Sequence, residues 1–274
     1  MVHYRAFPGR SRRMILAGLL FALCSYSGRA QDLEVGFTFG GGYYLGDLNP
    51  GKHFLHTKLA YGLVARYTLD TRWAVKLSGT RGTIKGDAGS SSFLPDRGLA
   101  FTSNLTDISG VVEFNFLPYF TGSRMSTLSP YIYGGISVFF YDPKFNGVSL
   151  RSIGTEGQKV GYEGRSPYGS VGVGIPFGLG IKYSLSNRLG LHAYWEMHKT
   201  FSDYLDDVST TYYLDGSTIS ENDPAGMLSD PTRSHKPGMQ RGSTSNKDWY
   251  AFFGASLTYK FSLLSPRKCR DLNH

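Results

Sequence analysis

The chain has 274 residues, of which 29 are basic and 21 acidic, and it contains 35 glycines and 37 tyrosines and phenylalanines. A hydrophobic content of 41% is too high for a disordered chain. Glycine and aromatic residues are both abundant in β-barrels, where they serve at bends and at membrane interfaces. After the N-terminal segment no run of 18 apolar residues occurs, which excludes a helical membrane protein.

Residues 1–30 have the composition of a secretory signal peptide. Basic residues precede an apolar stretch that ends at Leu23, and small residues at Gly28 and Ala30 predict cleavage after Ala30. A lipoprotein is the alternative because of Cys24, but the bulky Leu23 disfavours lipid attachment. Removing the leader's five arginines leaves 24 basic against 21 acidic residues, so the basic balance gives little support to nucleic-acid binding. The mature chain keeps one cysteine, which excludes an intrachain disulfide.

Eight segments of the mature chain alternate apolar residues with polar or small ones. A period of two is that of a β-strand with one apolar face. The apolar positions run from Leu33 to Phe39, Leu59 to Leu69, Trp73 to Leu77, Ile108 to Phe116, Ile132 to Phe140, Val171 to Tyr183, Leu189 to Met197, and Trp249 to Phe261.

The connections between these segments alternate in length, with tight or moderate ones on one side and long ones on the other. This is the topology of an outer-membrane barrel with its termini in the periplasm. A soluble lipocalin-like barrel is the alternative, but it would need a charged outer face, whereas the second face here is rich in glycine, as at Gly172 and Gly178. We therefore predict a signal peptide over 1–30, an eight-stranded antiparallel transmembrane barrel over 31–262 and a periplasmic tail over 263–274.

Six charged residues fall on the strand face opposite the apolar one and should point into the lumen. Charges removed from water must pair, so we expect at least two of the basic residues to contact a carboxylate. The interior of an eight-stranded barrel is filled by side chains, which favours a structural network without a transport role. Pro176 cannot donate to the ladder and should mark a bulge or a bend. The six residues are Arg66, Lys76, Glu113, Lys182, Glu196 and Lys260.

The sequence contains no nucleophile elbow, no P-loop and no H-E-x-x-H motif. We therefore expect no enzyme, no cofactor and no small-molecule substrate. Two groups could in principle hold a metal, but we interpret both as solvated loop residues. Two histidines, His192 and His198, lie on one strand without an identifiable nucleophile. The segment 215–247 is rich in small and polar residues and should be the most mobile part of the chain. The two groups that could hold a metal are His53 with His56, and Asp203 with Asp206 and Asp207.

Six stretches together resemble the PorG-like outer-membrane proteins of the type IX secretion system. The run over 199–212 is the most specific, and the resemblance covers about residues 113–261. It implies a non-enzymatic accessory barrel, without a cofactor, that associates with a periplasmic ring formed by a lipoprotein and its partner. The stretches are EFNFLP (113–118), SPYIYGG (129–135), GTEGQ (154–158), IPFG (175–178), KTFSDYLDDVSTTY (199–212) and RGSTSNKDWY (241–250).

Two functions follow as expectations. The first is a component that anchors the periplasmic ring to the outer membrane. The second is a free-standing small barrel that acts as an adhesin or a membrane-stability protein through its outer loops. For the first, the connection over 118–129 and the basic tail are the candidate docking elements, and the lone cysteine could pair with another chain. The residues concerned are Pro118, Arg267, Lys268, Cys269 and Arg270.

Overall fold

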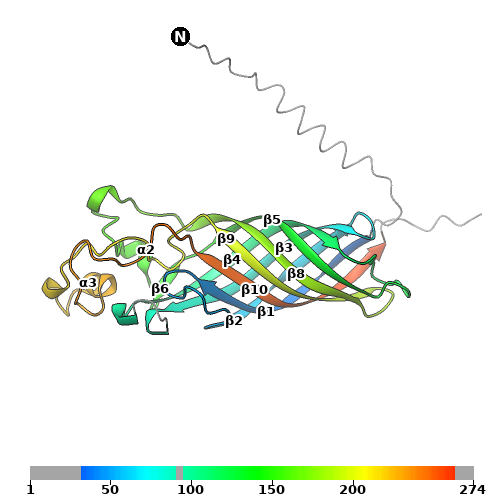
Figure 1. Cartoon of the computed structure of the whole chain (residues 1–274), viewed down its shortest axis with the longest axis horizontal. Helices are drawn as coiled ribbons and strands as arrows, with labels where there is room; N and C mark the ends of the chain where they lie inside the picture. Colours follow the sequence, from blue (N-terminus) through cyan, green and yellow to red (C-terminus); the bar gives the residue numbers. More distant parts are fainter. Residues whose placement is uncertain (1–31, 91–94, 263–274) are drawn as a thin grey trace, which may run out of the picture.

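The computed structural model describes residues 32–90 and 95–262 as an elongated barrel (Figure 1). Its strands pair antiparallel in the order β3-β2-β1-β10-β9-β8-β5-β4, and pairing of β3 with β4 closes the ring. The predicted eight-stranded antiparallel barrel is therefore confirmed. The eight strands are β1 (Asp32–Leu45), β2 (Lys58–Thr68), β3 (Trp73–Asp87), β4 (Ala100–Asn115), β5 (Leu128–Phe140), β8 (Val171–Ser184), β9 (Leu189–Thr200) and β10 (Trp249–Ser262).

The apolar face of the strands points outward. Phe37 and Ile136 are 73% and 75% exposed. The polar Thr38, on strand β1 between β2 and β10, is buried. A barrel that exposes apolar side chains and buries polar ones is suited to lipid and not to water, which argues against the soluble alternative. Glycine makes room inside: a Cβ atom at Gly172 would lie 2.3 Å from the ring of Phe139. The fold is that of an outer-membrane barrel.

The two ends of the barrel differ (Figure 1). At one end, which we call the turn end, Asp32 pairs with Ser262 and the connections are short. At the other, the loop end, long connections carry the small elements of the fold. Among the described residues, no helix is long and apolar enough to cross a membrane. The small elements at the loop end are β6 (Pro143–Phe145), β7 (Val148–Ser149), α2 (Leu150–Ile153), α3 (Pro224–Ser229), and the 3-10 turns Ala88–Ser90, Pro95–Arg97, Tyr162–Gly164 and Gly216–Thr218.

Strands β3 and β4 extend further toward the loop end than the apolar pattern predicts. Their ladder continues to the pair Asp87–Ala100, although the outward residues there are polar, as in the hydrogen-bonded pair Thr83 and Asn104. Backbone pairing does not require apolar side chains, so alternation marks only the part of a strand that faces lipid. At Pro176, predicted to mark a bulge, the ladder to β5 is interrupted, but the register is the same on both sides.

The interior is divided along the barrel axis. The turn half of the lumen contains the charged residues around Glu113. The loop half contains a cluster of buried aromatic and aliphatic side chains that continues into the loops, including Tyr44, Phe101, Phe139 and Phe252. Polar groups at one end and packed rings at the other leave a lumen filled by side chains. A cavity beside Arg66 and Glu196 measures only about 20 Å³, which is the space of about one water molecule.

Candidate functional site: the lumen network and the loop layer

The carboxylate of Glu113 is the centre of the first charged group in the lumen. Nε of Arg66 lies 2.7 Å from its Oε2, and Nζ of Lys182 lies 2.6 Å from the same atom. The guanidinium of Arg66 also contacts Glu34 at 3.0 Å. These residues come from β1, β2, β4 and β8, and all four are buried. Two cations and two carboxylates thus neutralise each other inside the barrel, as buried charges require.

A second charged group lies around Glu196. Nζ of Lys76 contacts one of its oxygens at 3.0 Å, and Nε2 of His198 contacts the other at 2.9 Å. Three of the four predicted basic residues therefore make the expected contacts with Glu113 or Glu196. The exception is Lys260, which lies at the rim of the turn end, 3.6 Å from Asp32, and belongs to neither group.

Sequence reasoning missed four members of this network. Glu34 and Asp107 lie on the inward face of their strands, so the same parity argument would have found them. The two histidines are the other members: His192 lies 3.4 Å from Glu34, and His198 lies 3.6 Å from Asp107. Pairing across the lumen depends on strand order in the closed ring, which parity on a single strand does not give.

One arrangement in the lumen has the residue types of a hydrolase triad. Oγ of Ser137 lies 3.3 Å from Nδ1 of His198, whose other ring nitrogen contacts Glu196. All three side chains are buried, and the ring of His198 stacks on Tyr250 at 4.3 Å between centroids. A nucleophile needs space beside it for a substrate carbonyl. The packing here is instead that of a structural hydrogen-bond network.

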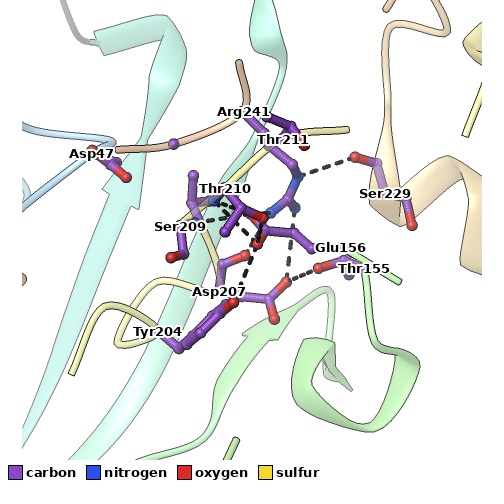
Figure 2. Close-up of polar contacts among 12 residues, drawn as sticks. Asp47, Thr155, Glu156, Tyr204, Asp207, Ser209, Thr210, Thr211, Ser229 and Arg241 are labelled. Atoms are coloured by element: carbon purple, nitrogen blue, oxygen red, sulfur yellow. Dashed lines mark hydrogen bonds and ion pairs between the residues drawn. The ribbon is translucent and has the colours of Figure 1, made fainter. Parts of the chain in front are cut away.

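The second candidate site lies in the loops, in a group that we call the loop layer: Glu156, Asp207, Ser209, Thr210 and Arg241 (Figure 2). Nη1 of Arg241 donates to Oε1 of Glu156 at 3.0 Å and to the backbone oxygen of Asp207 at 2.6 Å. The carboxylate of Glu156 also accepts the backbone amides of Ser209 and Thr210 at 2.8 and 3.0 Å. Both members of the ion pair are fully buried, and their contact joins the connection between β5 and β8 to the connection between β9 and β10.

The backbone around Glu156 requires glycine. Gly157 has φ of +79°, and a Cβ atom there would lie 2.7 Å from Tyr162 and 3.0 Å from Tyr213. Asp207 also has positive φ, at +66°, in a conformation that aspartate tolerates better than most residues. Its carboxylate accepts hydrogen bonds from Thr155 and, at 2.5 Å, from Tyr168. Burial raises the pKa of Asp207 to about 6, although Arg241 and the hydroxyl donors lower it.

Two further carboxylates share one tyrosine below the loop layer. The hydroxyl of Tyr44 contacts Asp206 and, at 3.1 Å, Asp248. Burial raises the pKa of Asp248 well above its usual value, and the charge of Asp206 raises it further. The interpretation of Asp203, Asp206 and Asp207 as solvated was therefore wrong, since all three are buried. Among the described residues, no group of three or more potential ligands is arranged to hold a metal ion.

The segment 215–247 makes more fixed contacts than its composition indicates. It contains α3, whose N-terminus is capped by the side chain of Asp223. Its Ser229 accepts a hydrogen bond from Nε of Arg241 at 3.3 Å, and Asp230 accepts from His235 at 2.9 Å. Ser229 and Asp230 are buried and bonded within the loops, although most small polar residues of the segment are exposed, and a composition argument cannot detect which ones are buried.

The connection over 118–129 closes the turn end of the lumen. Tyr119 and Thr121 are buried, and the hydroxyl of Thr121 donates to Glu34. Pro118 and Met125 are exposed, Met125 by 98%. The tail residues Arg267, Lys268, Cys269 and Arg270, and the signal peptide over 1–30, lie outside the described residues.

A family model described as "Domain of unknown function (DUF6089)" matches residues 12–270. No curated protein shows significant sequence similarity to the chain. Among solved structures, the chain is similar to the attachment invasion locus protein Ail of Yersinia pestis, at 10% identity over 85% of this chain and 100% of that one, with a TM-score of 0.41. It is similar to OprG of Pseudomonas aeruginosa, at 13% identity over 86% and 98%, with 0.43. It is also similar to outer membrane protein W of E. coli, at 15% identity over 85% of this chain and 99% of that one, with a TM-score of 0.37.

Proposed function

This chain belongs to the DUF6089 family, and from its barrel fold together with its resemblance to the PorG-like proteins we propose that it is a non-enzymatic outer-membrane component of the type IX secretion machinery that associates with the periplasmic ring. The observation that carries the proposal is the loop layer. Glu156, Asp207 and Arg241 come from three separate stretches that resemble the PorG-like proteins, and these stretches converge in one buried cluster (Figure 2). Stretches that lie far apart in the sequence and resemble the same family are thus parts of one structure.

The filled lumen supports the role of an anchor over that of a channel. Ion pairs fill the turn half, packed rings together with the pair of Glu196 and His198 fill the rest, and residues 118–129 cover the turn end. Nothing needs to pass through such a barrel for it to hold a periplasmic assembly at the membrane. In this proposal the termini lie in the periplasm, and the exposed Pro118 and Met125, together with the tail that carries Arg267, Lys268, Cys269 and Arg270, face the ring.

The second candidate is a free-standing barrel that acts as an adhesin or membrane-stability protein. The loop layer supports this second candidate, because the buried ion pair of Arg241 and Glu156 fixes a defined surface at the loop end. In that case the loops would be the functional surface, and the turn end would have no protein partner.

Co-purification from native membranes tests the proposal. The full chain, carrying an affinity tag in an exposed loop, is solubilised in mild detergent and isolated from the source cells. We expect a lipoprotein and its periplasmic partner to co-purify, and a Met125→Asp variant to retain less of both. A matched variant at the loop end, Val160→Asp, should retain as much as the unsubstituted chain, because Val160 is exposed at the opposite end. Isolation of the barrel alone would contradict the proposal and favour the free-standing barrel.

A further inference from the structure

A cluster of basic residues lies on the outside of the barrel just beyond its apolar band. On β3 and β4 the charged residues that point outward are Arg81 and Lys85, with Asp87 at the end of the strand. Arg81 pairs with Thr106, which pairs with Phe140 at the upper edge of the lipid-facing surface. The lumen network uses neither of the two cations.

A third cation joins them from the adjacent hairpin. Lys85 pairs with Thr102, and Thr102 pairs with Lys144 of β6, so the two lysines lie in one row across neighbouring strands. Lys85, Thr102, Asn104 and Lys144 line a groove of about 470 Å³ between the strands and the hairpin. The surface therefore has cations, hydrogen-bonding groups and a concave shape together.

The positive charge of this surface exceeds its negative charge. Asp87 lines one end of the groove, and Asp142 lies 3.5 Å from Lys144 and 3.8 Å from Arg151. A separate sign of the positive field is the adjacent His56: burial lowers its pKa, and Lys85 and Lys58 lower it further, against the opposite effect of Asp87. The described charged residues that line the groove are thus two cations, Lys85 and Lys144, against one carboxylate, Asp87, and Arg81 adds a third cation on the same outward face of β3.

We propose that the outward surface formed by Arg81, Lys85 and Lys144, which we call the basic face, binds the phosphate groups of an anionic glycolipid in the outer leaflet. The inference rests on the membrane topology of the proposed function, which places the loop end in that leaflet. The guanidinium of Arg81 donates to Thr106 at 3.1 Å, which holds the fork at the edge of the apolar band. A planar guanidinium suits phosphate oxygens, and lysines add point charges.

The height of the basic face distinguishes a glycolipid from a phospholipid. Lys85 lies four residues beyond Arg81, which is roughly 13 Å along the strand and, for a strand tilted by about 35–45°, roughly 10 Å along the membrane normal. The headgroup region of a phospholipid leaflet is only about 5–7 Å thick beyond the hydrocarbon. A headgroup made of phosphorylated sugars can reach both rows of cations, while a phospholipid headgroup reaches Arg81 alone.

Lipid retention by the purified full chain tests the basic face. The probes are phosphatidylcholine vesicles that contain bisphosphorylated lipid A, dephosphorylated lipid A or phosphatidylglycerol. The test variant is Arg81→Gln with Lys85→Gln and Lys144→Gln. The control, Lys159→Gln with Arg233→Gln and Lys236→Gln, removes the same charge from exposed loop positions. A heat-modifiable band on a gel shows that each variant is folded.

We expect the chain to retain bisphosphorylated lipid A, and the test variant to bind it about tenfold or more weakly, because it lacks the three cations that would contact the phosphates. The control should bind as the unsubstituted chain does. Equal binding by the test variant, or equal binding of phosphatidylglycerol or dephosphorylated lipid A, would overturn the proposal. Because no ring protein is present, this result is independent of the co-purification experiment. If the test variant does not fold, the single substitution Lys85→Gln replaces it, with a weaker expected effect of a few fold.

Discussion

The guanidinium of Arg241 lies 3.0 Å from the carboxylate of Glu156, and neither side chain is exposed to solvent. The two residues are 85 positions apart in the sequence. Their contact fixes the loops after β5 and β9 to each other above the barrel. The loop layer is thus held by buried charge, and the lumen is held in the same way by Glu113 with Arg66 and Lys182.

Replacing Arg241 should loosen the loop layer and leave the barrel intact. Arg241→Met leaves the buried carboxylate of Glu156 without its cation, which costs roughly 3–5 kcal/mol. Hydrogen exchange over residues 154–158 and 207–212 should accelerate, while the heat-modifiable band of the barrel is retained. Arg233→Met is the matched control, since its pair with Glu221 is exposed and contributes less than about 1 kcal/mol. Unchanged exchange in Arg241→Met would show that the ion pair does not hold the layer.

Substitutions in the lumen should separate the buried network from the rim. Glu113→Gln removes the charge that both Arg66 and Lys182 contact, and we expect a loss of roughly 3 kcal/mol or more in the free energy of unfolding. Lys260→Gln breaks the 3.6 Å contact with Asp32 at the rim and the contact of Nζ with the ring of Phe120 at 5.9 Å, and it should cost no more than about 1 kcal/mol. Urea unfolding of the barrel in lipid vesicles measures both. Equal losses would contradict the assignment of Lys260 to the rim.

The loop layer should be more stable in mild acid than at neutral pH. Burial raises the pKa of Asp207 from its usual 3.8 to about 6. The folded state therefore holds more protons than the unfolded state between about pH 4 and pH 6, so stability falls as pH rises through that window and stays low above it. The loss attributable to Asp207 is of order 3 kcal/mol. Asp47, whose pKa burial raises to about 6, acts in the same direction.

Hydrogen exchange of residues 207–212, corrected for the intrinsic effect of pH on exchange, measures this dependence. Asp207→Asn should flatten the profile, because it removes one of the titrating groups. Asp223→Asn is the control, since that carboxylate caps α3 at an exposed position. Exchange that slows as the pH rises from 4 to 7 would reverse the sign and refute the assignment.

Deleting residues 265–274 should leave barrel insertion intact, because β10 ends at Ser262. In the proposed function the tail contributes to docking through Arg267, Lys268, Cys269 and Arg270, so co-purification of ring proteins and secretion should both fall. Cys269→Ser in the full chain separates the thiol from the basic charges. Full secretion by the truncated chain would eliminate the tail as a docking element.

The sequence by itself determined the class of fold, because a period of two is imposed by strand geometry at every strand that faces lipid. From Val171 to Tyr183 the alternation fixes which side chains face outward and which face the lumen, and the same parity placed Arg66, Glu113 and Glu196 inside. Only the tertiary structure decided the partners. Lys182 on β8 meets Glu113 on β4 because β5 lies between these strands and the ring is closed, and no local pattern encodes that order.

In the loops, even more was decided by the tertiary structure and less by the sequence. Ser229, Asp230 and the carboxylates of Asp206 and Asp207 lie in segments with the composition of solvated loops, yet all four residues are buried. Burial there follows from contacts between segments such as Gly154 to Gln158 and Arg241, which are far apart in the chain and have no shared periodicity. In a strand, the alternation of residue types indicates which side chains are buried. In a loop, burial depends on distant residues that form hydrogen bonds with its polar groups.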